Sequence, residues 1–335
     1  MMLADAEPLV LDAQRVTIGY GGAPVVSELD LSVRHGEIVG LIGESGCGKS
    51  SVALATMGLL AGPARVTGER LRVCDTDALA ADRRPLEALR GRRVSMIFQE
   101  PMTSLNPCMR IGDQVAEVLR IHRLADRRAA RTRAVELLEL VEIPEPGKRA
   151  RQYPHELSGG MRQRVMIAIA MAGEPDLLLA DEPTTALDVT VQAEILELIR
   201  TLQRRTAMGV LLISHDLGVV ASMCDAVKVM YAGQVVESGP TAEVLGAPRH
   251  PYTQALLAAV PRASGQQDGR LAAIPGQVSP ADRATPGCRF ATRCALAGAG
   301  CEQPQRLRPA SADDDDSPDW QVRCWRQTGS EGPTQ

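Results

Sequence analysis

The segment Gly43-Glu44-Ser45-Gly46-Cys47-Gly48-Lys49-Ser50 fits the pattern G-x-x-x-x-G-K-[ST], whose residue types and spacing suit the binding of phosphate. Glycines let backbone N–H groups curve around a phosphate, and the start of a helix adds the positive end of its dipole. Lys49 is placed to contact the β- and γ-phosphates of a nucleotide, and Ser50 to hold Mg²⁺. The alternative is a glycine-rich turn ahead of a helix that binds no ligand.

A pair of carboxylates provides the second half of such a site. Asp181 and Glu182 directly follow the apolar run Leu177–Ala180. At the end of a strand, Asp181 can support Mg²⁺ and Glu182 can orient or deprotonate an attacking water. An acidic pair at a strand end is more often a solvated turn when it stands alone. Together with Lys49 and Ser50, the pair predicts a site that hydrolyses a nucleotide.

Strands and helices must position these residues, and the surrounding sequence has the matching patterns. Short strands broken by glycine-rich turns are expected at residues 10–13, 16–18, 29–33 and 38–42, and we expect an N-terminal antiparallel β region that leads into the phosphate-binding segment. After Glu182, a helix with one apolar face precedes another strand at 210–214, and the order strand, helix, strand implies a parallel sheet. Between 114 and 159, apolar residues recur at helical spacing among many arginines, which predicts a helical subdomain inserted into an α/β core.

The composition is that of a folded globular chain, with 44% hydrophobic and 23% charged residues among 335. A net charge of −4 gives no broad positive field, so we do not expect nucleic acid as a partner. The opening residues lack a basic start followed by an apolar stretch, and no run of 18 apolar residues occurs. We therefore expect a cytoplasmic chain whose role at a membrane, if it has one, is peripheral.

The segment Leu157-Ser158-Gly159-Gly160-Met161, shortly before the carboxylate pair, resembles the signature sequence of ABC transporter ATPases. By its own chemistry, this segment can form a second anion-binding helix start. In the family it contacts the γ-phosphate held by the other subunit, so the resemblance implies a head-to-tail dimer with ATP at the interface. Met161 stands where many members have Gln, a departure also found in peptide importers.

Other motifs of the ABC family follow in the expected order. Gln99 resembles the Q-loop residue that senses Mg²⁺ and the attacking water, and Asp188, next to Ala186, resembles the D-loop that links the two sites. His215 resembles the switch histidine near the γ-phosphate, and Tyr20 resembles the aromatic that stacks on adenine. Without this context, a lone histidine or glutamine is a surface or core residue, and Tyr20 a turn residue.

The resemblance implies ATP and Mg²⁺ as ligands and a role for each matching residue. Catalysis is expected from Glu182, His215 and Gln99, and Mg²⁺ coordination from Ser50, Gln99 and Asp181. Nucleotide binding is expected from residues of all the motifs: Tyr20, Gly43, Ser45, Gly46, Cys47, Gly48, Lys49, Ser50, Ser51, Gln99, Ser158, Gly159, Gly160, Asp181 and Asp188.

Three stretches narrow the resemblance to the ATPase subunits of dipeptide, oligopeptide and nickel importers. They are the extended Q-loop Glu100–Pro107, the motif His250–Thr253, and Cys288, Cys294, Cys301 and Cys324 with the spacing C-x5-C-x6-C-x22-C. This resemblance implies a peripheral location at the cytoplasmic face of the membrane. The implied partners are two transmembrane permease subunits, a second ATPase (a paralogue or another copy) and, indirectly, an extracytoplasmic substrate-binding protein.

The four C-terminal cysteines suggest metal ligation, because a reduced compartment disfavours disulfides. Their spacing is wider than that of paired zinc ligands. Members of the importer group with this pattern can carry a 4Fe–4S cluster, which four thiolates suit. We therefore predict a 4Fe–4S cluster at Cys288, Cys294, Cys301 and Cys324, with zinc or free thiols as alternatives.

The expected domains are an ATPase domain at residues 8–259, with its helical subdomain at about 100–160, a C-terminal extension at 260–325 and a tail at 326–335. A polar stretch with Asp313–Asp316 lies within the extension. The predicted function is ATP-driven import of peptides, or nickel, through a permease. The alternative is a soluble ABC-type ATPase that acts on nucleic acid or ribosomes, but such proteins have a coiled-coil insertion or tandem ATPase domains, and neither is evident here.

Overall fold

The computed structural model describes residues 8–80, 82, 84–100, 104–185, 187–259, 274–310 and 319–327. Several segments named above lie outside the described residues. They are residues 1–7 of the opening segment, 101–103 of the extended Q-loop, Ala186, the acidic run Asp313–Asp316 and residues 328–335 of the tail.

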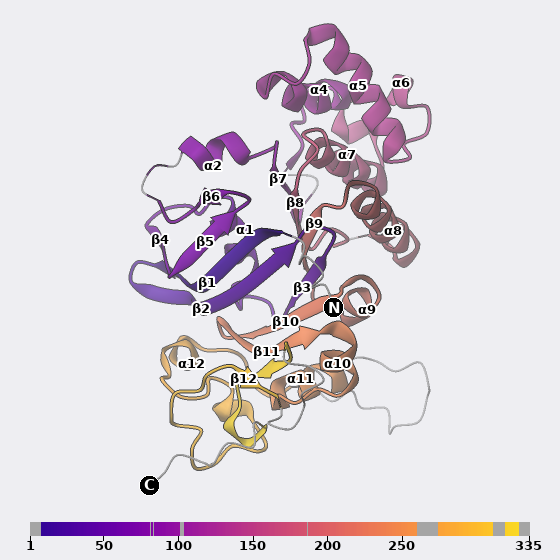
Figure 1. Cartoon of the computed structure of the whole chain (residues 1–335). Helices are drawn as coiled ribbons and strands as arrows, with labels where there is room; N and C mark the ends of the chain where they lie inside the picture. Colours follow the sequence, from indigo (N-terminus) through magenta and orange to yellow (C-terminus); the bar gives the residue numbers. More distant parts are fainter. Residues whose placement is uncertain are drawn as a thin grey trace, which may run out of the picture.

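A mostly parallel sheet forms the centre of the molecule (Figure 1). Its strands are β3 (Ile38–Ile42), β7 (Val94–Ile97), β8 (Leu177–Asp181), β9 (Gly209–Ile213), β10 (Ala226–Tyr231), β11 (Gln234–Pro240), β12 (Arg308–Pro309) and β13 (Gln321–Val322). Among the described residues, the order across the sheet is β12-β13-β11-β10-β3-β9-β8-β7. The strands from β10 to β7 are parallel, as the strand, helix, strand pattern predicted.

The central strands separate two hydrophobic cores. Every residue of β3, β8 and β9 is buried, as is typical of parallel strands covered on both faces. Successive side chains point to opposite faces, so Val210 and Leu212 of β9 join one core while Leu211 and Ile213 join the other. This packing holds the carboxyl ends of β3 and β8 rigidly in place, and the chemical motifs follow directly after those ends.

An antiparallel sheet begins before the phosphate-binding segment, as predicted, and strands that follow that segment complete it. Its strands are β1 (Leu9–Tyr20), β2 (Ala23–Arg34), β4 (Ala64–Thr67), β5 (Arg70–Val73) and β6 (Thr76–Asp77). The expected strands at 10–13 and 16–18 are a single strand, β1. The pairing register shifts between Ala13 and Val16, where Arg15 has a φ of 50°. A bulge there lets β1 continue instead of ending.

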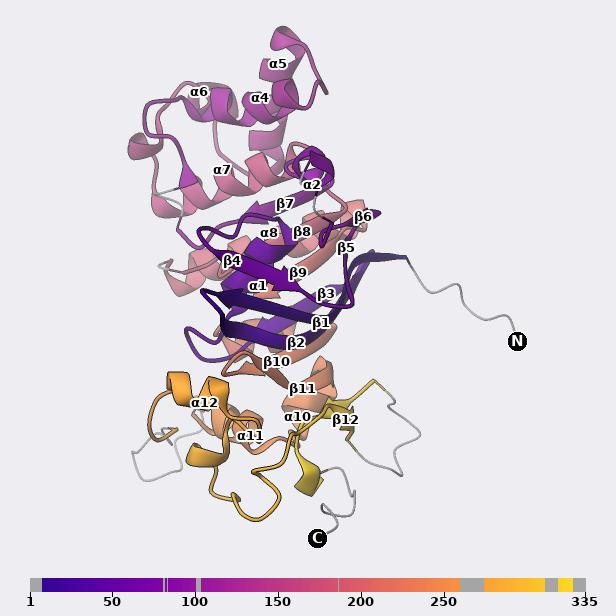
Figure 2. The ribbon, with the colours of Figure 1, turned by 90° about the vertical axis from the view of Figure 1, so that its left-hand side faces the viewer.

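Helices cover the sheet and form the inserted subdomain at one end of the molecule (Figures 1 and 2). The helices near the sheet are α1 (Lys49–Thr56), α2 (Arg84–Leu89), α8 (Val189–Thr206), α9 (Leu217–Met223), α10 (Thr241–Gly246), α11 (Pro251–Ala258) and α12 (Pro280–Ala284). The subdomain contains α4 (Ile111–Ile121), α5 (Arg127–Leu140), α6 (Pro146–Arg149) and α7 (Gly159–Met171). This is the predicted helical insertion, and α7 leads back into β8.

The C-terminal segments lie at the opposite end from the helical subdomain (Figure 2). They add β13 to the edge of the central sheet, where Val322 pairs with Glu237 of β11. The carboxylate of Glu237 is fully buried and accepts hydrogen bonds from the N–H groups of Arg249 and His250 and from Trp320 Nε1, at 2.8, 2.9 and 3.0 Å. These bonds satisfy the buried charge and join the C-terminal segments to the core.

Candidate functional site

The segment from Gly43 to Ser50 connects β3 to α1 at the carboxyl end of the parallel sheet. Lys49 is only 6% exposed, and its Nζ donates hydrogen bonds to the carbonyl oxygens of Gly43 and Glu44, at 2.7 and 3.1 Å. The ammonium group therefore lies inside the curve of the loop. No side chain caps the start of α1 at Gly48. The first-turn N–H groups of this helix are thus available to an anion, as a phosphate-binding loop requires.

Two glycines give the loop a shape that other residues would disturb. Gly43 has a φ of 149°, and a Cβ there would lie 2.1 Å from the carbonyl oxygen of Met230. Gly48 has a φ of 108°, and a Cβ there would lie 2.7 Å from Cγ2 of Val26. Both positions combine a left-handed backbone with close approach, for which glycine is the fitting residue. The glycine spacing in the sequence therefore reflects steric constraint as well as phosphate binding.

Asp181 meets the requirements of a Mg²⁺ ligand. It is the last residue of β8 and is 4% exposed, and its Oδ1 has no hydrogen-bond partner among the described residues. Burial raises the pKa of its carboxyl group, and a hydrogen bond from Ser50 counteracts part of that effect. A buried carboxylate oxygen without a partner is costly unless a cation joins it. Asp181 and Ser50 together therefore fit a hard, oxygen-seeking ion such as Mg²⁺.

Three side chains from separate segments meet at the carboxylate of Glu182. Gln99 Nε2 and Thr185 Oγ1 donate hydrogen bonds to Glu182 Oε2, at 2.9 and 3.0 Å, and His215 Nδ1 lies 3.3 Å from the same oxygen. Glu182 itself has a φ of 47°, a strained conformation for a residue with a side chain. The structure thus brings together Gln99, Glu182 and His215, which lie far apart in the sequence. Strain and convergence at one residue are typical of a catalytic position.

Other expected site residues lie apart from this cluster. Ser158 caps α7 by accepting a hydrogen bond from the N–H of Met161, at 3.3 Å, and Asp188 caps α8 in the same way through Val191, at 3.0 Å. Both side chains are exposed, and so is Gly159. Tyr20 is half-buried at the end of β1. In the described part of the chain, none of these residues hydrogen-bonds to the phosphate-binding loop.

Gly160 and the remaining loop residues also have clear positions. A Cβ on Gly160 would lie 2.8 Å from Val191, so this glycine lets α7 and α8 approach closely. Ser45 and Gly46 are exposed at the tip of the loop, and Ser51 is half-buried in α1. Cys47 is 1% exposed, and burial raises the pKa of its thiol. It is therefore a small apolar residue whose side chain points from the loop into the core.

Two groups of residues at the site were not among the sequence predictions. Thr185 contacts Glu182, and its position three residues after Glu182 was the available signal. Arg283 and Arg293 contact the phosphate-binding loop from the C-terminal segments. No local pattern connects these arginines with a loop more than 230 residues earlier. Tyr252, which also contacts the loop, falls in the motif His250–Thr253, but that motif indicated only where the C-terminal extension begins.

The prediction of a 4Fe–4S cluster at Cys288, Cys294, Cys301 and Cys324 is wrong. In the ranges that the structure describes, no three Cys, His, Asp or Glu side chains are arranged so that they could hold a metal ion, so the zinc alternative has no support either. Cys288, Cys294 and Cys324 pack against the hydrophobic core, and all four thiols are free. Burial raises the pKa of Cys288 to about 11, which disfavours the thiolate that a metal needs. Cys288, Cys294 and Cys324 therefore serve as small, partly buried residues that pack against the core.

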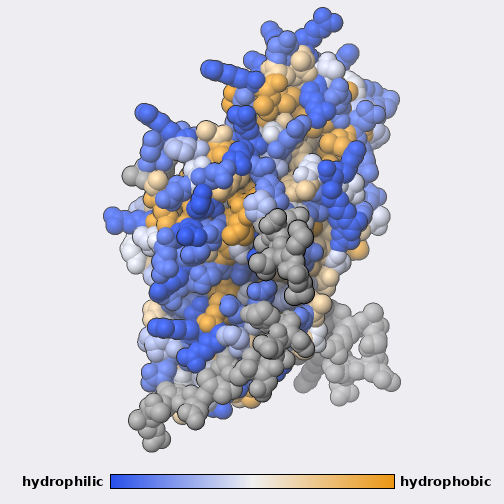
Figure 3. Space-filling model, in the orientation of Figure 1, coloured by the Kyte–Doolittle hydropathy of each residue, from blue (hydrophilic) through white to orange (hydrophobic). Residues whose placement is uncertain are grey.

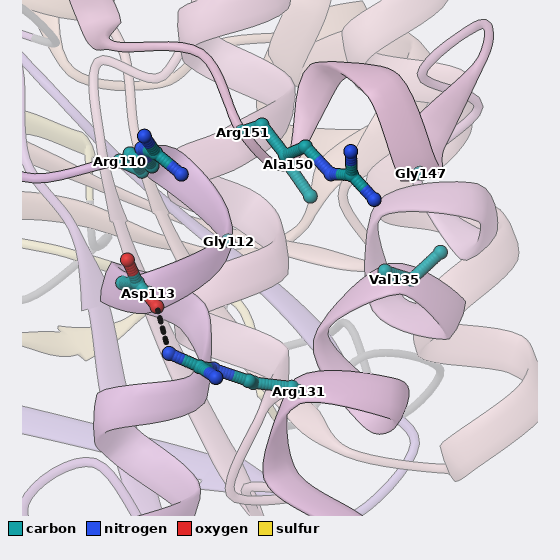
Figure 4. A pocket seen from close by; sticks show the side chains of 8 residues that line it. All are labelled: Arg110, Gly112, Asp113, Arg131, Val135, Gly147, Ala150 and Arg151. Carbon is teal, nitrogen blue, oxygen red and sulfur yellow. Dashed lines mark ion pairs between the residues drawn. The ribbon is translucent and has the colours of Figure 1, made fainter. Parts of the chain in front are cut away.

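A cavity of about 430 Å³ lies in the helical subdomain, away from the motifs (Figure 4). Arg110, Arg131 and Arg151 contribute to its lining, and Arg131 forms an ion pair with Asp113 at 3.8 Å. None of the expected nucleotide-binding residues lines it. The cavity therefore does not compete with the loop and the carboxylate pair as the candidate site.

A phosphate-binding loop after β3 and a carboxylate pair at the end of β8 are the two halves of a nucleotide-hydrolysing centre. The fold and the site together thus define a P-loop ATPase. Comparison with known families is more specific. The family model described as "ABC transporter" matches residues 26–185, and that described as "Oligopeptide/dipeptide transporter, C-terminal region" matches residues 236–301.

Individual relatives match over most of the chain. The Probable D,D-dipeptide transport ATP-binding protein DdpD of Escherichia coli (strain K12) is 49% identical over 88% of this chain and 90% of its own length. The Dipeptide transport ATP-binding protein DppD of Bacillus subtilis (strain 168) is 44% identical over 95% of each chain. Among solved structures, the dimeric ATP-binding cassette MJ0796 bound to ADP and Pi has a TM-score of 0.61 and 26% identity over 69% of this chain and 98% of its own.

The chain belongs to the family of ABC transporter ATP-binding proteins, in the group that carries the oligopeptide/dipeptide transporter C-terminal region. It is therefore an ATPase, as predicted. The comparisons give no support to the alternative of a soluble ABC-type ATPase that acts on nucleic acid or ribosomes. In the described ranges, none of the helices has the length and apolar character needed to cross a membrane.

Proposed function

We propose that this chain is the ATP-hydrolysing subunit of an importer for dipeptides or oligopeptides. The convergence of Gln99, Thr185 and His215 on Glu182 carries the proposal, because it assembles a catalytic base. The direction of transport and the class of substrate follow from the relatives, which are named as dipeptide transport and peptide import ATP-binding proteins. Nickel is a further candidate cargo.

At the nucleotide, the loop and Lys49 bind the β- and γ-phosphates, and Ser50, Asp181 and Gln99 hold Mg²⁺. Mg²⁺ held by these residues would neutralise phosphate charge. Tyr20, at the end of β1, stacks on adenine. All three contacts to Glu182 fall on Oε2, so Oε1 is the oxygen that accepts a proton from the attacking water. His215 and Gln99 orient this carboxylate, and His215 also faces the γ-phosphate.

ATP joins two ATPase domains in our proposal. Ser158, Gly159 and Asp188 are exposed, and Val189 beside them is 84% exposed, which is unusual for a large apolar side chain. We therefore propose that the start of α7 and the start of α8 face the nucleotide of a second ATPase subunit. That subunit is a paralogue or another copy of this chain. Closure of the dimer on ATP and its reopening after hydrolysis then drive the membrane subunits.

Two transmembrane permease subunits are the partners that this motor moves. The segment after Gln99 and the helical subdomain form the surface that we propose for their docking. Phe98 is 40% exposed next to Gln99, and Ile121 and Leu124 at the end of α4 are 67% and 43% exposed. On the face shown in Figure 3, hydrophobic residues gather over this subdomain. The chain would thus lie peripherally at the cytoplasmic face of the membrane, with an extracytoplasmic binding protein delivering the peptide.

Affinity purification of the full chain from its native membranes tests this proposal. We expect two multi-span permeases and a second ATPase to co-purify, and we expect a strain that lacks the chain to lose uptake of labelled dipeptides. A Lys49→Ala variant, which cannot bind phosphate normally, should keep its partners but fail to restore uptake. Co-purification of soluble proteins alone would overturn the transporter assignment, and normal uptake by the Lys49→Ala strain would overturn the role of the site.

A further inference from the structure

The C-terminal segments reach across the molecule and hold the phosphate-binding loop. Arg293 forms a two-pronged ion pair with Glu44, at 2.8 and 2.9 Å, and its side chain is only 6% exposed. The hydroxyl of Tyr252 accepts a hydrogen bond from the N–H of Glu44, at 2.9 Å. Arg283 donates to the carbonyl oxygen of Gly46, at 2.7 Å. The loop therefore has anchors outside β3 and α1.

The two strongest anchors are themselves held in place. Arg293 Nε donates to the carbonyl of Pro275, at 2.6 Å, and its guanidinium lies 5.6 Å from the centre of the Tyr231 ring. Tyr252 is fully buried and packs against Tyr231 and Phe290, with ring centres 4.7 and 5.4 Å apart. Little side-chain freedom remains to be lost when a ligand arrives. The anchors can thus pre-organise the loop.

Charge gives Arg293 a second effect. Glu44 is the second residue of a loop that must accept a polyphosphate, and a carboxylate there would repel that anion. A guanidinium that pairs with both carboxylate oxygens neutralises the charge and fixes its position. The ion pair should therefore strengthen the binding of ATP and have little effect on its hydrolysis. In the described part of the chain, no contact joins Arg293 to Glu182 or to the residues around Glu182.

We infer that Arg293 and Tyr252 are positioning residues that set the affinity of this ATPase for ATP, by holding Glu44 and neutralising its charge. The C-terminal region thereby contributes to nucleotide binding indirectly, through Glu44. The inference rests on the proposed nucleotide site. Tests on the full chain can separate a failure of either idea, because binding and hydrolysis are measured independently.

The first test compares Arg293→Ala with the native chain. Loss of a charge-assisted pair beside the phosphates should raise both the Kd for a fluorescent ATP analogue and the KM for MgATP about tenfold. The kcat should change less than about twofold, because the lost interaction acts on ground state and transition state alike. Arg293→Lys should give an intermediate KM. Arg326→Ala is the matched control, since Arg326 stacks on Trp325 in the same region and should leave KM unchanged.

A second test distinguishes charge from general structural damage. In the double variant Glu44→Gln/Arg293→Ala the unpaired carboxylate is gone, so KM should fall back to within about threefold of the native value. Tyr252→Phe keeps the ring within its aromatic cluster and removes only the hydroxyl that Glu44 N–H uses. It should raise KM about three- to tenfold. This variant remains informative if Arg293→Ala does not fold.

Three results would overturn the inference. They are an unchanged KM in both Arg293→Ala and Tyr252→Phe, a double variant no better than Arg293→Ala, and a fall in kcat without a change in KM. A different result would contradict the proposed function and leave the inference standing. In that case the native chain would bind the ATP analogue more tightly than Arg293→Ala does, but would hydrolyse no ATP with its partners present.

Discussion

Replacing Glu182 by Gln removes the proposed base with little change to the surrounding structure. The glutamine keeps the length of the side chain and one oxygen that can accept from Gln99 and Thr185, whose donors lie 2.9 and 3.0 Å from Glu182 Oε2. The stability of the fold should therefore change by less than about 1 kcal/mol, as for a substitution that leaves no buried group unpaired. What is lost is the negative charge that receives the proton of water.

The expected loss of rate follows from that role. General base catalysis contributes about 10²- to 10⁴-fold, so kcat should fall by that factor, or about 3–5 kcal/mol in activation free energy. The Kd for MgATP should stay within about threefold of the native value, because Lys49, Ser50 and Asp181 are unaffected.

Phosphate release at saturating MgATP, with the partner subunits present, measures the rate, and a fluorescent ATP analogue measures binding. Glu174→Gln is the matched control, since the side chain of Glu174 is 79% exposed and lies outside the site. It should have native activity. A Glu182→Gln variant that keeps more than about a tenth of the native kcat would refute the assignment of Glu182 as the base.

Three further predictions follow from individual residues. Burial lowers the pKa of His250 to about 3, so below about pH 6.5 the unfolded chain binds a proton that the folded chain does not. The free energy of unfolding should therefore fall by about 1.4 kcal/mol for each unit by which the pH is lowered from 6.5 towards 3. Gly43→Ala should cost about 2–5 kcal/mol in urea unfolding, from its φ and a clash with backbone, whereas Gly46→Ala should cost only about 1–2 kcal/mol. Exposed Cys108 should react with iodoacetamide at pH 8 long before Cys224, whose pKa is raised by burial to about 12.

Each of these predictions has its own control. His250→Asn keeps an acceptor for the N–H of Tyr252 and should flatten the pH dependence of stability, and an unchanged slope would contradict the account of His250. Equal destabilisation by Gly43→Ala and Gly46→Ala would show that the clash with Met230 is absent. Peptide mapping by mass spectrometry identifies the alkylated cysteines, and early labelling of Cys224 in the folded chain would contradict its burial.

The sequence alone determined the chemistry that depends on neighbours along the chain. The loop from Gly43 to Ser50 and the carboxylate pair after Leu177–Ala180 are local patterns, since each directly follows the end of a strand, and the loop leads into a helix. The parallel sheet followed from the order of apolar strands and amphipathic helices. Two strands were expected where the structure has the single strand β1. A bulge at Arg15 keeps β1 continuous, and such a bulge depends on strand pairing, which residue propensities do not encode.

The cysteines show the opposite case, in which a sequence pattern led to a wrong prediction. Spacing along the chain says which thiols exist but not where their sulfurs point. Cys288, Cys294 and Cys324 pack against the apolar core, and the arrangement of the four cysteines is not that of a metal site. Burial satisfies a thiol as readily as ligation does, because cysteine is a small hydrophobic residue.

Only the tertiary structure decided which distant groups meet. Gln99 and His215 reach one oxygen of Glu182 because parallel strands end at a common edge. Arg293 reaches Glu44 from 249 positions away, where the carbonyl of Pro275 and the ring of Tyr231 hold its guanidinium. A phosphate-binding loop consists of consecutive residues, and its motif can therefore be recognised in the sequence. The ion pair and the hydrogen bond that hold this loop depend on contacts across the whole fold, which no local pattern contains.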